Sequence, residues 1–252
     1  MNILHIDASP RQESHSRQLS AAIVERLLEV APGARVSRRD LGADPLPHAA
    51  ADYAVALSSP ATLAAPPKGA LDCSEALIQE VEAADVIVIG TPMHNFTIPS
   101  VLKAWIDQIL RVGRTMKSTP AGKVGMLRDR PVFIGVASGG IFTGDRPNQP
   151  DFLTPYLTLA LNSIGLKNLQ FLPIQATASF DHNQAALARE KALAAIDLTD
   201  MGSFAASMVA PQCSQVPVEG PCFGESRTGS ALRARRKLLA RPHHNPPASA
   251  GL

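Results

Sequence analysis

The apolar run Val86-Ile-Val-Ile89, which ends at Gly90, constrains the fold of this chain more than any other segment. A short run of β-branched residues that stops at a turn signal is typical of a strand buried on both faces. Strands of this kind belong to parallel sheets whose two faces are covered by helices. Because ligands bind beyond the carboxyl ends of strands in open parallel sheets, the run also predicts a binding site at residues 92–96.

Strand and helix patterns alternate along most of the chain. Short apolar segments predict strands at residues 2–6, 35–41, 86–90, 131–137 and 168–173. Apolar residues at helical spacing predict helices at residues 16–31, 74–84, 99–112, 151–164 and 184–196, with Ser16 as the N-cap of the first. The alternation predicts an α/β fold with a doubly wound parallel sheet, and its five strands match the flavodoxin-like count. Residues 42–70, rich in Ala, Pro and Ser, are expected to form a surface excursion with a helical piece.

The net charge of +2 conceals a difference between two parts of the chain. Residues 202–252 hold six Lys or Arg and two Glu, which gives +4, and the preceding residues hold 18 basic and 20 acidic groups, which gives −2. Residues 1–201 are nearly neutral and do not show the excess of basic residues that is typical of a nucleic-acid-binding domain. We therefore expect a domain at residues 1–201 and an irregular, basic, Pro-rich and disordered C-terminal extension at residues 202–252. Contact of that extension with nucleic acid or a membrane surface is the alternative.

Features that report on compartment point to the cytoplasm. No apolar run is long enough to span a bilayer, and no basic segment precedes an apolar stretch at the N-terminus. The three cysteines, Cys73, Cys213 and Cys222, are widely spaced, which suits a reducing environment. They show no metal-ligand spacing, so no metal site is expected.

A serine-rich loop, with Ser9, Ser14, His15 and Ser16, lies between the first predicted strand and the first predicted helix. Unpaired N–H groups and the helix dipole favour an anion at such a position, and these side chains could ring a monophosphate. The G-x-G-x-x-G and G-x-x-x-x-G-K-[ST] fingerprints are both missing, which favours flavin mononucleotide (FMN) over NAD as the tightly held ligand. The alternative is that the serines serve only as helix cap and turn.

Four residues that follow the central apolar run are suited to line a flavin: Met93, His94, Asn95 and Phe96. Met93 and Phe96 offer apolar cover, and the N–H groups of the loop can point at the polar edge of the ring. Asn95 could bond ring heteroatoms. The alternative is an ordinary strand-to-helix turn in which Asn95 acts as a cap.

A third loop, Ala137-Ser138-Gly139-Gly140, follows the strand predicted at residues 131–137. Glycines permit positive φ and a close approach of the backbone to a planar ring. A Gly-Gly pair alone is common in turns. Three suitable loops at the carboxyl ends of parallel strands, however, predict one shared site.

Together with Arg39-Asp-Leu41, Ile98-Pro-Ser-Val-Leu-Lys103 and Leu153-Thr-Pro-Tyr156, these motifs make residues 1 to about 200 resemble the FMN-dependent NADH-azoreductases, also called NADH:quinone oxidoreductases. The resemblance implies bound FMN, NADH or NADPH as electron donor, and a quinone or azo compound as substrate. It also implies a homodimer with each active site near the interface. By position, Ser9 and residues 14–16 would hold the phosphate, residues 93–96 would line the flavin, and residues 137–140 would close its pyrimidine end.

The sequence departs from the family pattern at two places. His94 stands where the family usually has Tyr, and Ala137-Ser138 replaces the usual Ser-Arg before the glycines, which removes a side chain near the flavin. In the expected ping-pong exchange, NAD(P)H delivers a hydride to FMN, and the acceptor then takes two electrons. His94 is the candidate catalytic proton donor, because an imidazole titrates near neutral pH; the alternative is a histidine that only packs on the ring.

Alternatives stay open for four side chains and for the function. Trp105 is expected either at the dimer interface or in the core, and Lys103, Arg111 and Arg114 are expected on a solvated helix face rather than in NADH binding. A flavodoxin-like one-electron carrier would be strongly acidic and aromatic-rich, whereas aromatic residues make up 4% of this chain. A non-enzymatic binding module would not need three flavin loops.

Overall fold

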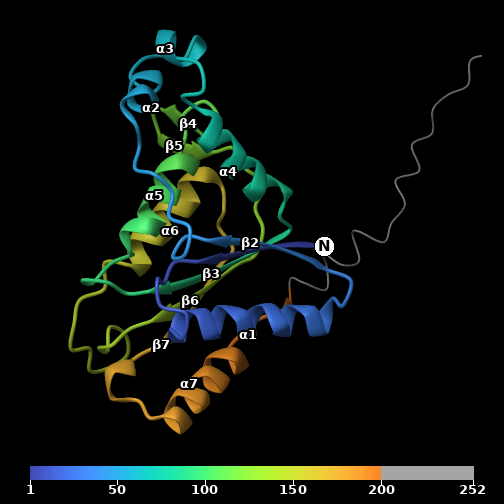
Figure 1. The fold of residues 1–252 in the computed structure, drawn as a ribbon, viewed down its shortest axis with the longest axis vertical. Helices are drawn as coiled ribbons and strands as arrows, with labels where there is room; N and C mark the ends of the chain where they lie inside the picture. Colours follow the sequence, from blue (N-terminus) through green and yellow to red (C-terminus); the bar gives the residue numbers. More distant parts are fainter. Residues whose placement is uncertain (200–252) are drawn as a thin grey trace, which may run out of the picture. The chain divides into compact units, whose positions relative to one another are not determined.

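A computed structural model describes residues 1–199, and the predicted boundary at residue 201 and the extension at residues 202–252 lie outside the described residues. The described part contains a five-stranded parallel sheet in the order β2-β1-β3-β6-β7 (Figure 1). Its strands are β1 (Asn2–Asp7), β2 (Arg35–Asp40), β3 (Val86–Pro92), β6 (Val132–Ala137) and β7 (Leu169–Ile174). The predicted α/β fold with a doubly wound parallel sheet of five strands is confirmed, and β3 is its central strand.

Helices cover both faces of this sheet (Figure 1). On one face lie α1 (His15–Val30) and α7 (His182–Ala194), and on the other lie α4 (Asp72–Ala83), α5 (Ser100–Ile109) and α6 (Thr154–Ile164). Strand β3 supplies both cores, because Val86 and Val88 pack on the α1 side while Ile87 and Ile89 pack on the α4 side. All four side chains are at most 1% exposed, as the apolar run predicted.

The strand order reverses between β1 and β3. From β1 the chain moves outward to β2, then returns past β1 to form β3 and continues to β6 and β7. Asp7 pairs with Gly90 in the parallel register, so β1 and β3 end close together. Such a switch point is where open α/β sheets bind their ligands, because the loops after the two strands diverge there.

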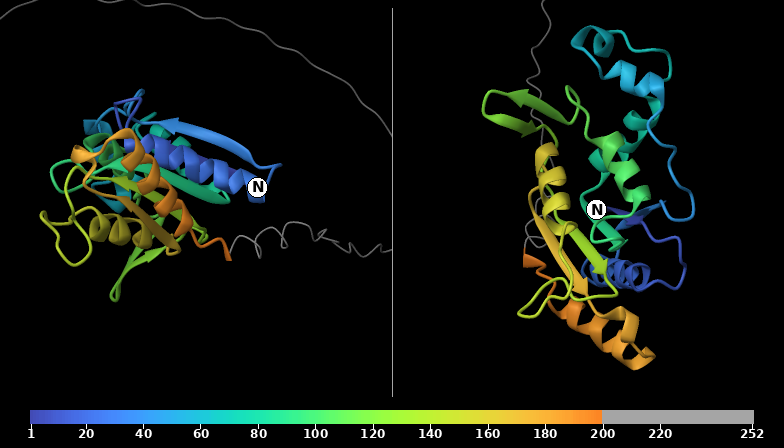
Figure 2. Two further views of the ribbon diagram at one scale, coloured as in Figure 1. Left: turned by 90° about the horizontal axis from the view of Figure 1, so that it is seen from below. Right: turned by 90° about the vertical axis from the view of Figure 1, so that its left-hand side faces the viewer.

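Two local features differ from the sequence prediction. Helix α1 begins at His15 with Ser14 as its N-cap, whose Oγ accepts a hydrogen bond from Arg17 N–H at 3.3 Å, so the prediction of Ser16 was wrong. Ser14 holds the extended backbone that a cap requires, whereas Ser16 is already helical. The antiparallel hairpin of β4 (Met116–Thr119) and β5 (Gly122–Gly125) was not predicted, because its short strands are mostly polar (Figure 2).

The remaining segments agree with expectation in part. The excursion at residues 42–70 holds two short helices, α2 (Ala51–Ala56) and α3 (Pro60–Ala64). Trp105 is fully buried in the core on the α4 side, which supports core packing over an interface role. Arg111 and Arg114 do not form a solvated face: they bind Glu75 of α4, and Arg111 is only 6% exposed. Among residues 1–199, no helix has the length and apolarity needed to cross a bilayer.

Candidate active site

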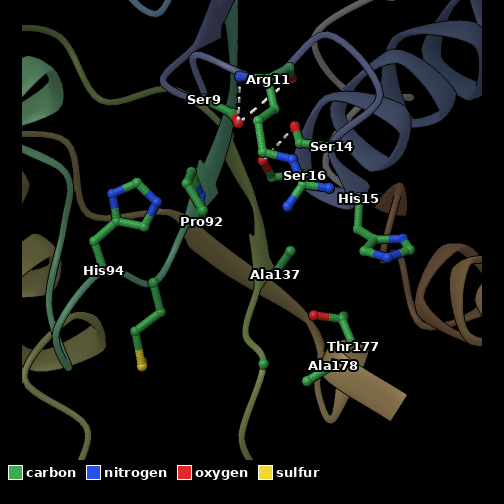
Figure 3. Close-up of a pocket in the computed structure, with 12 residues that line it drawn as sticks. Ser9, Arg11, Ser14, His15, Ser16, Pro92, His94, Ala137, Thr177 and Ala178 are labelled. Atoms are coloured by element: carbon green, nitrogen blue, oxygen red, sulfur yellow. Dashed lines mark hydrogen bonds between the residues drawn. The ribbon is translucent and has the colours of Figure 1, made fainter. Parts of the chain in front are cut away.

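A cavity of about 300 Å³ lies at the carboxyl ends of β1, β3 and β6 (Figure 3). Its walls come from the loops after these strands and from a short segment after β7. The lining residues are Ser9, Arg11, Ser14, His15, Ser16, Pro92, Met93, His94, Ala137, Gly139, Thr177 and Ala178. The three loops selected from the sequence therefore meet at one pocket.

One end of the pocket presents hydroxyl groups beside the N-terminus of α1. Figure 3 shows Ser9, Ser14 and Ser16 on the same side of the pocket, with His94 across it. Ser9 Oγ accepts a hydrogen bond from Arg11 N–H at 3.3 Å, and the Oγ atoms of Ser14 and Ser16 are 3.3 Å apart. The first turn of α1 carries no acidic side chain. Hydroxyls and helix N–H groups in this arrangement suit a phosphate.

Two basic residues complete this end. His15 stacks edge-on against Phe180 with ring centroids 6.0 Å apart. Burial lowers the pKa of His15, and the positive charges of Arg11 and Arg189 lower it further. Arg11 was not selected from the sequence, although a cation two residues after Ser9 in a candidate phosphate loop was a usable signal.

The loop after β3 forms a tight reversal. His94 and Thr97 exchange two backbone hydrogen bonds of 2.9 and 3.0 Å, with Asn95 and Phe96 between them at φ of 47° and 72°. A left-handed backbone is tolerated by Asn and strained for Phe. Met93 and His94 line the cavity, whereas Asn95 and Phe96 form the tip of the turn outside the lining.

The loop after β6 also has some residues that line the cavity and others that lie outside the lining. Ala137 and Gly139 line the cavity, and Met93 N–H donates to the Ala137 carbonyl at 2.8 Å, which ties the second loop to the third. Ser138 is buried, and its Oγ accepts a hydrogen bond from Gln149 Nε2 at 2.6 Å. A Cβ at Gly140 would lie 2.6 Å from Gln149 Oε1, so this glycine makes room for Gln149.

Pro92, which ends β3, also lines the cavity and lies within the site predicted at residues 92–96. Two further lining residues were missed: Thr177 and Ala178, which belong to the 3₁₀ turn Thr177–Ser179 that follows β7. Thr177 Oγ1 donates to the Ser138 carbonyl at 3.0 Å, which holds this turn against the third loop. The rule that sites lie after strand ends would have found this turn, had it been applied to the last predicted strand.

A buried polar cluster underlies the serine loop. Asp7 is fully buried at the end of β1, where it accepts hydrogen bonds from Ser20 Oγ and Arg38 Nη2, each at 2.8 Å. Burial raises the pKa of Asp7, but hydrogen bonds with His5, Ser20 and Arg38 bring the net shift below the usual value. Asp7 is therefore an ionised carboxylate. Its negative charge is offset by the nearby Arg17 and Arg38, which reduces its repulsion of an anion in the pocket.

The residues present fit FMN. Three hydroxyls, a helix N-terminus and Arg11 suit a phosphomonoester at one end, and Pro92, Met93 and Ala137 offer apolar cover for a planar ring. Within the part of the chain that the structure describes, no group of His, Cys, Asp and Glu side chains could hold a metal ion.

The fold and the pocket define a protein of the flavodoxin-like class, and the family model for the flavodoxin-like fold matches residues 1–198. FMN-dependent NADH:quinone oxidoreductase 4 of Pseudomonas fluorescens is 51% identical over 175 residues, which are 69% of this chain and 84% of that protein. FMN-dependent NADH:quinone oxidoreductase 5 of Burkholderia lata is 48% identical over 184 residues, 71% of this chain and 87% of that protein.

A comparison with solved structures leads to the same family as the sequence relatives. An FMN-dependent NADH-azoreductase of Bacillus anthracis in complex with FMN superimposes with a TM-score of 0.68 at 26% identity, over 77% of this chain and 96% of that chain. The chain belongs to this family, the FMN-dependent NADH:quinone oxidoreductases with the flavodoxin-like fold. The resemblance noted from the sequence motifs is confirmed.

Proposed function

We propose that this protein is an FMN-dependent NADH:quinone oxidoreductase that also cleaves azo compounds reductively. The observation that carries the proposal is the pocket at the β1–β3 switch point, which joins a phosphate-binding end to an apolar wall. Two relatives that are 51% and 48% identical over the aligned residues are named FMN-dependent NADH:quinone oxidoreductases, and a protein of similar structure is named an FMN-dependent NADH-azoreductase. FMN, when bound, would supply the chemistry, which is two-electron transfer from NAD(P)H to the acceptor.

The chain's own residues bind and orient the reactants. Ser9, Ser14 and Ser16 would hold the phosphate together with the N–H groups of α1. Met93 and Ala137 would exclude water from the ring, and Gly139 leaves one side of the cavity free of a side chain. Donor and acceptor would take the same place over the ring in turn, which is the ping-pong order expected from the sequence.

His94 is the candidate residue for proton transfer. Its ring lies on the cavity wall opposite the serines (Figure 3), within the region that an acceptor would enter. A protonated imidazole there can donate to the oxygen or nitrogen that receives electrons. Asn95, Phe96, Ser138 and Gly140, which lie outside the lining, stay predicted flavin contacts that depend on the loops adjusting around the ring.

A homodimer in the cytoplasm is the proposed working form. Exposed apolar side chains gather around α6 and the β4–β5 hairpin: Val124 is 42% exposed, Met126 51% and Leu159 73%. Between these elements lies a groove of about 460 Å³ lined in part by Met116 and Tyr156. Apolar patches of this kind are typical of protein interfaces, which favours a second copy of this chain as the partner.

Flavin spectroscopy on the purified chain tests the proposed activity. We expect a yellow protein whose absorbance bleaches with NADH under anaerobic conditions and returns when a benzoquinone is added. A colourless protein that gains no flavin spectrum with added FMN contradicts the proposal. A flavoprotein that NADH cannot reduce would instead support the one-electron carrier.

A further inference from the structure

The Arg39-Asp-Leu41 motif at the end of β2 lies outside the pocket, yet it is joined to the serine loop through one side chain. Asp40 pairs with Asp7 in the parallel register of β2 and β1, which places its carboxylate beside the start of α1. Arg17 of α1 reaches this carboxylate from the other side and is 5% exposed. The function proposed above makes no use of either residue.

Arg17 bonds both ends of the loop that runs from Ser9 to Ser14. Its backbone N–H donates to Ser14 Oγ at 3.3 Å, and its side-chain Nε–H donates to the Ser9 carbonyl oxygen at 2.9 Å. The two Nη atoms then donate to the two carboxylate oxygens of Asp40, one of them at 2.7 Å. A bidentate pair of this kind fixes the plane of the guanidinium and hence the direction of Nε–H.

The turn after β2 holds Asp40 in place. Ala43 N–H donates to Asp40 Oδ1 at 3.0 Å, and Leu41 N–H donates to the Asp7 carbonyl at 2.8 Å. A Cβ at Gly42 would collide with the Ser9 carbonyl and would lie 2.9 Å from Arg17 Nη2, so only glycine lets this turn pack under the loop. The turn after β2 therefore packs closely against the Ser9 carbonyl and the Arg17 guanidinium.

The electrostatics of the pair also matter for an anion in the pocket. Hydrogen bonds from Arg17 lower the pKa of Asp40, and those to Asp40 raise the pKa of Arg17, so both groups are charged. Their charges neutralise each other. The pair therefore acts on a phosphate mainly through loop geometry, because a Ser9 carbonyl freed from Arg17 could turn its negative end toward the anion.

We propose that Arg17 and Asp40 form a positioning pair that sets the serine loop for the phosphate of a phosphorylated flavin, without touching the ligand. The inference rests on the proposed function, since it names what determines FMN over riboflavin at the same site. It assigns to the Arg39-Asp-Leu41 motif a role in cofactor selectivity.

The test compares two flavins that differ only in the phosphate. The flavin-stripped full chain and its Arg17→Lys and Asp40→Asn variants are titrated with FMN and with riboflavin, following the quenching of flavin fluorescence. Lys keeps the charge but cannot hold both Asp40 and Ser9 in a fixed fork. We expect each variant to bind FMN at least about tenfold more weakly, which corresponds to 1.4 kcal/mol, and to change riboflavin affinity less than about twofold.

Arg111→Lys is the matched control. Arg111 is also a buried arginine with a carboxylate partner, Glu75, but its side chain bonds Ser74 Oγ of α4 at 3.1 Å where Arg17 bonds the serine loop. This variant should leave both flavin affinities unchanged. Thermal unfolding followed by circular dichroism checks that each protein is folded. If Arg17→Lys does not fold, the test relies on Asp40→Asn, which replaces a partly exposed side chain with its isostere.

Three results would separate the possible failures. An equal loss of FMN and riboflavin affinity in a folded variant overturns the inference, because the pair would then act on general stability. Unchanged FMN affinity in both variants overturns it as well. A wild-type chain that binds neither flavin contradicts the proposed function instead.

Discussion

The side-chain amide of Gln149 donates to Ser138 Oγ at 2.6 Å and lies 3.1 Å from Met93 Sδ. One residue from the segment between β6 and α6 thus joins the loop after β3 to the loop after β6. Because Ser138 is buried, its hydroxyl cannot bond water, and the hydrogen bond with Gln149 satisfies it instead. Gln149 is a support for the wall that is proposed to face the flavin ring.

Gln149→Ala should weaken the binding of FMN and riboflavin alike, by about five- to tenfold, because it removes a hydrogen bond worth about 1 kcal/mol from the ring wall. Fluorescence titration with both flavins measures the effect. The nearby Thr143→Ala change, which leaves the backbone bond from Thr143 N–H to Gln175 Oε1 intact, is the control. A loss confined to FMN would contradict a role at the ring.

Arg11→Ala should weaken FMN binding about tenfold and reduce its dependence on salt, because an exposed cation at the pocket is lost. The same change should raise the pKa of His15, since Arg11 is one of the two charges that lower it. Titration of the His15 ring by NMR checks the second effect. Arg26 lies on α1, as His15 does, and its side chain is 52% exposed. Arg26→Ala should change neither FMN affinity nor the pKa of His15.

His94→Gln should slow the reoxidation of the reduced protein by a quinone by about 100-fold, because general acid catalysis contributes on that order. Reduction by NADH, which needs no proton from this residue, should slow far less. Stopped-flow measurement of the two half-reactions separates them. His94→Tyr, which restores a proton-donating side chain, is the matched comparison. If His94→Gln reoxidises at the rate of the wild type, the imidazole only packs against the ring.

Glu75→Gln should destabilise the fold by about 1 kcal/mol at pH 7, after allowance for solvent screening of a side chain that is 35% exposed. Hydrogen bonds from Arg114 and Arg111 lower the pKa of Glu75 to about 2. A carboxylate with a lowered pKa stabilises the folded state above its ordinary pKa, and this contribution is lost as the pH falls from 4.5 toward 2. The free energies of unfolding of the two proteins, measured with urea, should therefore become equal as the pH approaches 2. A difference that stays constant at all pH values would contradict the ion-pair assignment.

Leu159→Glu should convert a dimer into a monomer, because it places a charge in the exposed apolar groove beside α6. Sedimentation velocity measures the change. Leu187→Glu is the matched control: Leu187 is 64% exposed on α7, which covers the opposite face of the sheet (Figure 1). A dimer that survives Leu159→Glu but not Leu187→Glu would place the interface on that opposite face.

Local patterns were enough to predict the sheet. The run from Val86 to Ile89 is β-branched and apolar at every position, so burial on both faces follows from the residues alone. Helical stripes in α1 and α5 reflect a period of 3.6 residues and need no knowledge of partners. The β4–β5 hairpin was missed because strands such as Met116–Thr119, with mostly polar residues, carry no period that stands out from a loop.

The position of the pocket was also predictable, because loops after parallel strands converge at one edge of the sheet. Which side chains face the cavity was not. Asn95 and Phe96 turn away from the lining because of two left-handed φ values, and Ser138 is held by an amide eleven residues further along the chain. The environment of Arg111, which follows the end of α5, could not be predicted from local pattern either, since its partner Glu75 lies on α4.

For this protein, the order of strands and helices, the three loops and the family were readable in the residues, because each rests on short stretches with their own period or motif. The support beneath those loops was decided by tertiary structure. Arg17 reaches Ser9 and Asp40 only because β2 pairs with β1 in a parallel register that sets Asp40 opposite Asp7. Hydrogen bonds between segments distant in the chain depend on distance and angle in space, which no local periodicity records.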